Sequence, residues 1–200
     1  MHFDAILPSG GRARRLGGAA KPLLRVAGVS LLERALLAAG SARHIVVVGP
    51  EDLPIPPGAH QVREDPPFGG PAAAVAAGLD LLRQLGDPAP WLLVLAADQP
   101  AAELLVPPLL AAAGAGPAGA QAWIGTDAGG RRQLLTALYA TDPLSAAVRR
   151  LRKRSPRAGL AGRPFRELIA GLVVREVTLP AAAAGDIDTW ADATHWGAIP

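Results

Sequence analysis

The 200-residue sequence contains no cysteine, which excludes disulfide bridges, thiolate metal sites and a cysteine nucleophile. Its four histidines are scattered and lack the HxH or HxxxH spacing of a histidine metal site. Charged residues make up only 18% of the chain and hydrophobic residues 50%, whereas disordered proteins show the opposite balance. The sequence therefore predicts a folded protein, and its length is typical of a single domain spanning residues 1–200.

The sequence shows no sign of a targeting or membrane-spanning segment. The first residues carry no positively charged region of the kind that begins a signal peptide. One uncharged stretch, residues 104–126, is long enough to span a bilayer, but three prolines and four glycines interrupt it. We interpret this stretch as a buried helix followed by a loop, and we expect a cytoplasmic protein that does not bind a membrane.

Positive charge exceeds negative charge only slightly. The formal net charge is +3, and much of the excess lies in a run of five arginines and one lysine between Arg149 and Arg157. The favoured interpretation of this run is the solvated end of an amphipathic helix. The alternative is a patch that receives the phosphate of a substrate, with Arg163 and Arg166 beside it. A nucleic-acid groove ranks third because no aromatic residues are interleaved with the run, and we expect no nucleic-acid partner.

Apolar runs and helical patterns alternate along the chain. The expected strands lie at residues 3–7, 45–48, 91–96, 122–125, 134–139 and 172–179. The expected helices lie at residues 31–39, 71–85, 142–156 and 165–170. Ser30 can cap the first of these helices, and Pro71 and Gly86 are placed to begin and end the second. The alternation predicts an α/β fold, a three-layer α/β/α sandwich around a mostly parallel, mixed sheet.

The segment that follows the first strand, residues 8–22, combines glycines with positive charge. It contains two glycine pairs, three arginines and Lys21. Glycine lets backbone N–H groups approach phosphate oxygens closely, and the cations neutralise phosphate charge. The spacing matches neither the Walker loop nor the Rossmann fingerprint. On these residues alone, a phosphate-binding loop and an ordinary basic surface loop carry equal weight.

The same segment resembles the signature of the MobA-like nucleotidyltransferases, in which a glycine pair precedes an arginine, further glycine and a lysine. The matching residues are Gly10, Gly11, Arg15, Gly17, Gly18 and Lys21. Departures from the signature are Pro8 and Ser9 in place of Leu-Ala, Leu16 in place of Met, and Ala20 where many members have Asp. Four further blocks occur in the family's order, at residues 65–79, 95–100, 133–139 and 186–192. The resemblance covers nearly the whole chain and implies a fold like that of the nucleotide-diphospho-sugar transferases.

The resemblance also implies roles for individual residues. The catalytic residues would be Arg15, Lys21 and Asp98. The nucleotide would contact Pro8, Ser9, Gly10, Gly11, Lys21, Asp65 and Asp98. A magnesium ion would bind Asp98 and also Asp188, and the acceptor substrate would contact Asp186, Asp188 and Arg163.

Each of these acidic residues has a structural alternative. Asp98 follows an apolar strand, where parallel sheets bind ligands and where a carboxylate suits Mg²⁺, but it could also cap the next helix. Asp65 precedes Pro66 and could form a turn. Asp186 and Asp188 point the same way on an extended chain. They could instead form a cap or a turn at the start of the final helix.

The activity that the resemblance implies is Mg²⁺-dependent transfer of GMP from GTP to the molybdopterin (molybdenum) cofactor, with release of pyrophosphate. Transient contact with proteins that deliver or accept the cofactor would accompany it. The pairs Gly10-Gly11 and Gly70-Pro71 resemble the guanylyl branch, whereas residues 98–100 and 186–189 occur equally in the cytidylyl branch. The alternatives are a CTP-using molybdopterin cytidylyltransferase, a nucleotidyltransferase acting on another small phosphate, and a nucleotide-binding module without transferase activity.

Overall fold

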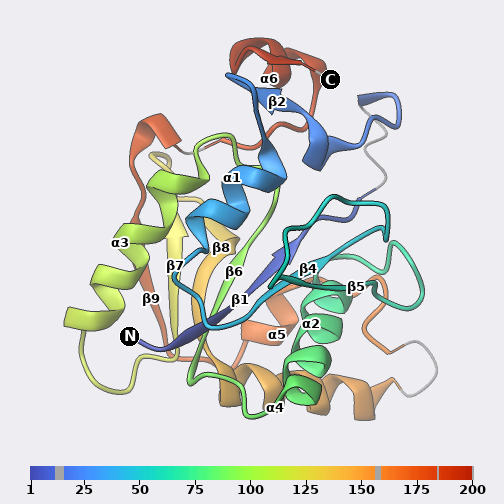
Figure 1. Cartoon of the computed structure of the whole chain (residues 1–200). Helices are drawn as coiled ribbons and strands as arrows, with labels where there is room; N and C mark the ends of the chain where they lie inside the picture. Colours follow the sequence, from blue (N-terminus) through green and yellow to red (C-terminus); the bar gives the residue numbers. More distant parts are fainter. Residues whose placement is uncertain (12–15, 156–158, 184, 200) are drawn as a thin grey trace.

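The computed structural model describes residues 1–11, 16–155, 159–183 and 185–199. A seven-stranded sheet forms its centre, with the strand order β5-β4-β1-β6-β8-β7-β9 (Figure 1). All of these strands run in one direction except β8, which pairs antiparallel with β6 and β7. The strands are β1 (Phe3–Pro8), β4 (Ile45–Val48), β5 (His60–Val62), β6 (Trp91–Leu95), β7 (Ala122–Thr126), β8 (Arg132–Ala140) and β9 (Val174–Thr178). The predicted mostly parallel, mixed sheet is confirmed.

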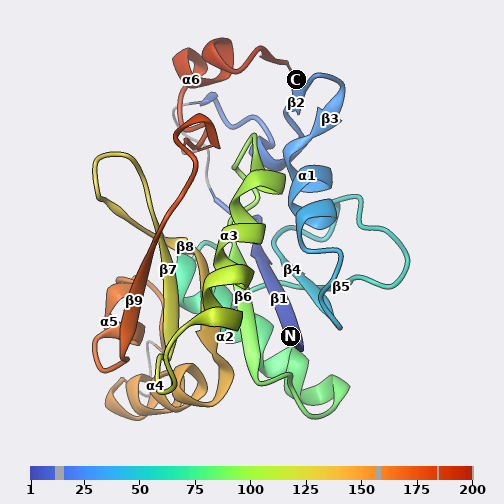
Figure 2. The ribbon, with the colours of Figure 1, turned by 90° about the vertical axis from the view of Figure 1, so that its left-hand side faces the viewer.

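Helices cover both faces of this sheet because its strands send alternate side chains to opposite sides. In β1, Ile6 packs into the core under α2, α4 and α5, whereas Ala5 and Leu7 pack into the core under α1 and α3. Figure 2 shows α3 in front of the sheet and α2 behind it. The helices are α1 (Leu31–Ala38), α2 (Pro71–Leu85), α3 (Ala102–Ala115), α4 (Thr141–Arg154) and α5 (Arg166–Ile169). The predicted three-layer sandwich is confirmed.

The signals that predicted the first two helices act as expected. Ser30 Oγ accepts a hydrogen bond from Glu33 N at 3.2 Å, and Glu33 Oε2 accepts one from Ser30 N at 2.8 Å, so the two residues cap α1 reciprocally. Gly70 precedes α2 with a φ of 87°, a conformation that favours glycine. Its carbonyl accepts the first helical hydrogen bond, from Ala74 N at 3.0 Å.

A hairpin reverses the chain between β7 and β8. Asp127 Oδ1 accepts hydrogen bonds from Gly129 N at 3.0 Å and Arg131 N at 2.9 Å, which closes the turn. The hairpin places β8 beside β6, and β9 then pairs parallel with β7 at the edge. The hairpin therefore joins the two strands that the sequence predicts at residues 122–125 and 134–139.

The sequence patterns did not predict β5 or a small second sheet of order β10-β2-β3. β5 is short and polar, and the strands of the second sheet, β2 (Arg25–Val26), β3 (Val29–Ser30) and β10 (Ala198–Ile199), have two residues each. A last helix, α6 (Trp190–His195), lies with β2 at one end of the molecule in both views (Figures 1 and 2). In this second sheet, β10 near the C-terminus pairs with β2, which follows the glycine-rich loop (residues 8–22).

The uncharged stretch at residues 104–126 contains most of α3, a loop and then β7. The expected helix and loop are confirmed, and the stretch ends in the strand expected at residues 122–125. The helix is only partly buried, because Leu105, Val106 and Leu109 are buried whereas Leu104 is 46% exposed. Within the described ranges, the helices are all too short or too polar to cross a lipid bilayer. The assignment of residues 1–200 to a single domain stays a prediction.

Candidate active site

The candidate site lies at the carboxyl ends of β1, β4, β5 and β6, where parallel sheets bind their ligands. Backbone hydrogen bonds continue past the strands and fix the loops that follow them. Ser9 N donates to Val48 O at 2.8 Å, and Ala97 N donates to Pro8 O at 3.0 Å. The start of the glycine-rich loop and the segment that carries Asp98 are therefore held against each other.

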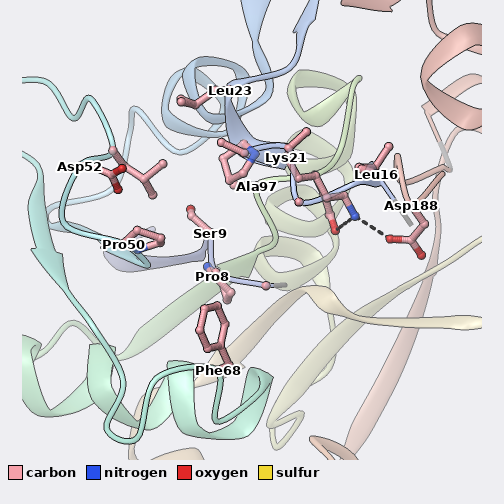
Figure 3. Close-up of a pocket in the computed structure, with 18 residues that line it drawn as sticks. Pro8, Ser9, Leu16, Lys21, Leu23, Pro50, Asp52, Phe68, Ala97 and Asp188 are labelled. Atoms are coloured by element: carbon pink, nitrogen blue, oxygen red, sulfur yellow. Dashed lines mark hydrogen bonds and ion pairs between the residues drawn. The ribbon is translucent and has the colours of Figure 1, made fainter. Parts of the chain in front are cut away.

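A cavity of about 730 Å³ opens over these strand ends (Figure 3). Seven of the predicted site residues line it, namely Pro8, Ser9, Gly10, Gly11, Lys21, Asp98 and Asp188. Leu16, Leu23, Pro50, Leu53 and Phe68 add apolar walls. Among the described residues, the cavity therefore combines a glycine-rich backbone, the cation Lys21 and the carboxylates of Asp52, Asp98 and Asp188 with apolar surface.

Lys21 is the centre of the charged part of the cavity. Its Nζ donates hydrogen bonds to Asp98 Oδ2 at 2.8 Å and to Asp188 Oδ1 at 2.6 Å, as Figure 3 shows. Burial by itself would lower the pKa of Lys21, but the two carboxylates outweigh this effect and raise the pKa above its ordinary value. Lys21 therefore keeps its positive charge.

Asp186 completes a cluster of three carboxylates. One oxygen from each of Asp98, Asp186 and Asp188 lies within 4.8 Å of the others. Desolvation and the negative charges of Asp98 and Asp188 raise the pKa of Asp186. Asp98 Oδ1 is buried and accepts no hydrogen bond from the described part of the chain. Three convergent carboxylates, one of them with a buried oxygen that lacks a partner, fit a divalent cation such as Mg²⁺.

Ile187 positions the two C-terminal carboxylates of this cluster. Its N–H donates to the carbonyl oxygen of Asp98 at 3.2 Å, and its side chain is fully buried. The small core around it also contains Leu16, Leu24, Leu31 and Ala193. Because side chains alternate along an extended segment, burial of Ile187 turns Asp186 and Asp188 together toward Asp98.

The capping alternatives for these acidic residues do not match the structure. The N-cap of α3 is Ala101, which makes no side-chain hydrogen bond there. The N-cap of α6 is Thr189, which forms a reciprocal capping box with Asp192. Asp98, Asp186 and Asp188 thus cap neither helix.

Two other predicted site residues are not part of this cluster. Asp65 is exposed and lines a different cavity of about 300 Å³, beside Asp80 and Arg152. The guanidinium of Arg163 donates hydrogen bonds to Glu167 Oε2 at 2.6 Å and to Ser155 Oγ. Arg15 lies outside the described residues. The structure thus brings neither Asp65 nor Arg163 to the carboxylates.

The arginine run lies on α4, at the end of the molecule opposite to α6 and β2 (Figure 1). Arg149, Arg150, Lys153 and Arg154 are exposed, whereas Leu144, Val148 and Leu151 on the other face are buried. This arrangement matches the favoured interpretation of a solvated face of an amphipathic helix. Arg157 lies outside the described residues.

Two residues near the site were not selected from the sequence. Glu64, which follows β5, is only 6% exposed, and Phe68 is 47% exposed despite its large apolar side chain. Both line a cavity of about 260 Å³ that shares Pro8, Gly10, Gly11 and Asp98 with the larger one. Recognition of β5 as a strand would have placed Glu64 at the carboxyl edge of the sheet.

A polar cavity of about 170 Å³ adjoins the other side of the carboxylate cluster. Asp186 lines it together with Gln99, Asp127, Arg131, Gln133 and Thr136. Gln133 Nε2 donates to Asp127 Oδ2 at 3.0 Å, so the β7–β8 hairpin helps to form this wall.

Comparison with known proteins finds one matching protein family and several similar structures. The family model described as the MobA-like NTP transferase domain matches residues 5–170. The molybdopterin-guanine dinucleotide biosynthesis protein A of Archaeoglobus fulgidus has a similar structure, with a TM-score of 0.66, 19% identity and coverage of 97% of this chain and 96% of that one. The search of curated proteins found no matching sequence.

Two cytidylyltransferases also have similar structures. The 2-C-methyl-D-erythritol 4-phosphate cytidylyltransferase of Thermus thermophilus has a TM-score of 0.65 and 22% identity, with 98% of this chain and 97% of that one covered. The enzyme of the same name from Francisella tularensis has a TM-score of 0.71 and 13% identity, with 98% and 99% covered. At these identities the likeness shows the fold, which is that of the nucleotide-diphospho-sugar transferases.

Proposed function

The chain belongs to the MobA-like NTP transferase family and is a nucleotidyltransferase, and from this premise we propose that it transfers GMP from GTP to the molybdopterin cofactor and releases pyrophosphate. The observation that carries the proposal is the pair of hydrogen bonds from Lys21 to Asp98 and Asp188, at the mouth of a glycine-lined cavity. A cation and carboxylates at one point are what a metal-bound triphosphate requires.

The transfer needs charge neutralisation and positioning. A phosphate oxygen of the acceptor forms a bond to the α-phosphorus of the nucleotide, and the bond from that phosphorus to the α,β-bridging oxygen breaks. Pyrophosphate leaves with the electron pair of the broken bond, and no protein nucleophile takes part. Backbone N–H groups at Gly10 and Gly11 and the ammonium of Lys21 would hold the triphosphate.

We propose that Asp98, Asp186 and Asp188 hold the magnesium ion. When bound, Mg²⁺ would neutralise phosphate charge and polarise the reacting phosphate. Among the described residues, the three carboxylates outnumber the ammonium of Lys21, and this excess of negative charge would attract a divalent cation. Ile187 and the small core around it would keep the carboxylates in place without touching the substrates.

The acceptor would approach from the side of Asp186. The polar cavity there presents carboxylate, amide, hydroxyl and guanidinium groups, which suit a ligand that is rich in hydrogen-bonding atoms. The name of the Archaeoglobus fulgidus protein supports molybdopterin as the acceptor and guanine as the base. Arg163 has no part in this proposal, because its guanidinium is bonded to Glu167 and Ser155.

A second candidate function is cytidylyl transfer, either to molybdopterin or to a small alcohol phosphate. The names of the two cytidylyltransferases of the same fold support it. We further propose that the enzyme works in the cytoplasm. Transient contact with proteins that deliver or accept the cofactor stays a prediction.

Pyrophosphate release with each of GTP, CTP, UTP and ATP, with Mg²⁺ and with or without molybdopterin, tests the proposal. We expect release only with GTP and acceptor together. Preference for CTP would favour the second candidate, and no release from any nucleotide would favour a binding module without transferase activity.

The Asp98→Asn variant tests the site itself. Because Asp98 does not cap α3, the variant should keep its fold and lose turnover by about two to three powers of ten or more. Lys21→Ala should mainly weaken nucleotide binding, since it removes a cation and no metal ligand. The matched control is Asp87→Asn, an exposed residue in the loop between α2 and β6, which should retain full activity. If Asp98→Asn unfolds while its residual activity stays normal, the assignment of Asp98 to the active site would be contradicted.

A further inference from the structure

Glu64 is a buried acidic residue for which the proposed reaction has no use. It follows β5 at the carboxyl edge of the sheet and is 6% exposed. It lines the cavity of about 260 Å³ together with Gly10, Gly11, Phe68 and Pro71. A buried carboxylate is costly unless hydrogen-bond donors reach it, so its partners need to be identified.

The described residues use only part of the hydrogen-bonding capacity of Glu64. Oε1 accepts a hydrogen bond from Phe68 N at 3.0 Å, and Oε2 accepts none from the part of the chain that the structure describes. Each oxygen of an ionised carboxylate can accept two hydrogen bonds. Capacity for further donors therefore remains on both oxygens.

The unused capacity faces the glycine-rich loop. A methyl group added at Gly10 would lie 3.7 Å from Glu64 Oε1 and 4.0 Å from Glu64 Oε2. Glycine at this position thus leaves the space beside the carboxylate open. This smaller cavity shares Gly10, Gly11 and Asp98 with the larger cavity in which we place the triphosphate, so one ligand can occupy both.

The walls of the smaller cavity suit a flat, partly apolar group. The ring of Phe68 lines both cavities, and Figure 3 shows it on the side of Pro8. Pro71 and Leu135 add further apolar surface. A heterocyclic base attached to a triphosphate matches an apolar slot that ends in a carboxylate.

Among the common bases, guanine matches an acceptor-only group. Its Watson–Crick edge presents two adjacent donors, N1–H and N2–H₂, to the two oxygens of a carboxylate. Cytosine and adenine present a lone pair beside their single amino group, and uracil presents one N–H between two carbonyl oxygens. For these bases an acceptor would face the carboxylate, which is repulsive.

We propose that Glu64 selects guanine by accepting hydrogen bonds from N1–H and N2–H₂ of the base. The inference rests on the proposed function and names the residue that determines which nucleoside triphosphate binds. It assigns base recognition to Glu64 and not to its neighbour Asp65, which faces a different cavity.

Equilibrium binding of GTP, inosine triphosphate, CTP and inorganic tripolyphosphate, each with Mg²⁺, tests the inference in the full-length protein. Inosine triphosphate lacks only the N2 amino group, so wild-type protein should bind GTP about 10- to 100-fold more tightly, the usual effect of one hydrogen bond to a charged group. In Glu64→Gln, the amide N–H₂ would oppose the donors of guanine, and the GTP preference should fall to less than about threefold. Binding of tripolyphosphate should not change, because it has no base.

Two further variants keep the test independent of folding. Glu176→Gln is the matched control, since this exposed glutamate on β9 pairs with Arg132 and should keep the wild-type preference. Gly10→Ala leaves Glu64 in place but fills the space beside its carboxylate at ordinary contact distance, and it should weaken GTP binding more than tripolyphosphate binding. Thermal unfolding measured by circular dichroism shows whether each variant is folded.

The outcomes separate this inference from the proposed function. Equal binding of GTP and inosine triphosphate by the wild type, stronger binding of CTP, or loss of the preference in Asp65→Asn but not in Glu64→Gln would each overturn the role of Glu64 alone. Failure of every nucleotide and of tripolyphosphate to bind wild-type protein would overturn the proposed function and, with it, this inference.

Discussion

Asp186 is held in the unliganded protein at the cost of electrostatic repulsion. Desolvation and the charges of Asp98 and Asp188 raise its pKa, so the folded protein binds a proton at this carboxyl more tightly than the unfolded chain does. The ionised form therefore opposes folding above the raised pKa, and the opposition is relieved as the pH falls through it. The same repulsion favours a divalent cation, which takes the place of the proton.

We expect Asp186→Asn to raise the melting temperature of the metal-free protein at neutral pH, because it removes one charge of the cluster. The gain should shrink as the pH falls through the raised pKa of Asp186, since the wild-type side chain then becomes neutral too. Thermal unfolding in the presence of a chelator, over a range of pH, measures both effects. Asp142→Asn, an exposed residue on α4, is the control that should show no such gain. A loss of stability in Asp186→Asn would show that its charge is compensated by other groups.

At the scale of the elements, the C-terminal segment holds its carboxylates through one buried side chain. Ile187→Ala would leave a cavity in the small core around Leu16, Leu24 and Leu31, at a cost of about 2 to 4 kcal/mol. Because Asp186 and Asp188 flank this residue, we also expect weaker Mg²⁺ binding and slower pyrophosphate release.

The control is Ile187→Val, which removes one methylene group and should cost about 1 kcal/mol and keep most of the activity. Denaturant unfolding followed by tryptophan fluorescence measures the change in stability, and metal titration measures the change in Mg²⁺ binding. Full activity in a destabilised Ile187→Ala would show that the carboxylates are positioned by other contacts.

A second prediction concerns the contact between α2 and β1. A Cβ atom at Gly78 would lie 2.7 to 3.0 Å from three side-chain carbons of the buried Ile6. Gly78→Ala should therefore destabilise the protein by about 1 to 2 kcal/mol although alanine favours helices. Gly114→Ala on α3 is the matched comparison, because nothing lies within 4 Å of its added Cβ, and it should raise stability by about 0.5 kcal/mol. The free energy of unfolding in urea, measured for both variants and the wild type, tests this prediction. Equal changes in the two variants would contradict the close contact at Gly78.

The sequence predicted the long elements better than the short ones. The strands β4 and β6 are continuous apolar runs, and β1 is apolar except for Asp4. The helices α1 and α2 have explicit capping and terminal residues, so local chemistry is enough to locate these elements. β5 has the sequence His-Gln-Val and forms because it pairs with β4, which no local pattern shows. In the second sheet, β10 depends in the same way on its distant partner β2. The strands β2 and β3 form a local hairpin around Ala27 and Gly28, but each has only two residues.

The candidate site divides along the same line. The glycine-rich loop that ends near Lys21 and the segment that carries Asp98 each follow a strand that the sequence predicts, and the structure brings them together. Glu64 follows an unpredicted strand and was missed. The family resemblance predicted that Asp65 contacts the nucleotide, whereas in the structure Asp65 lines another cavity. The catalytic and binding roles of all these residues stay predictions.

For the molecule as a whole, ligand binding should be visible as stability. A nucleotide that binds only the folded state at 100 times its dissociation constant adds about 2.7 kcal/mol. For a protein of this size we therefore expect Mg²⁺ and GTP together to raise the melting temperature by roughly 5–10 °C. Differential scanning calorimetry measures the shift. Asp98→Asn should show a much smaller one, and an equal shift in that variant would place the nucleotide elsewhere.

The ion pair between Lys21 and Asp188 joins residues that are 167 positions apart. Closing a loop of that length is entropically costly, and contacts of large sequence separation slow folding. During refolding from urea, the sheet and its covering helices can therefore regain their circular dichroism before the carboxylates meet. Recovery of metal affinity should lag behind recovery of secondary structure, so early refolded species would be compact but unable to take up the cation.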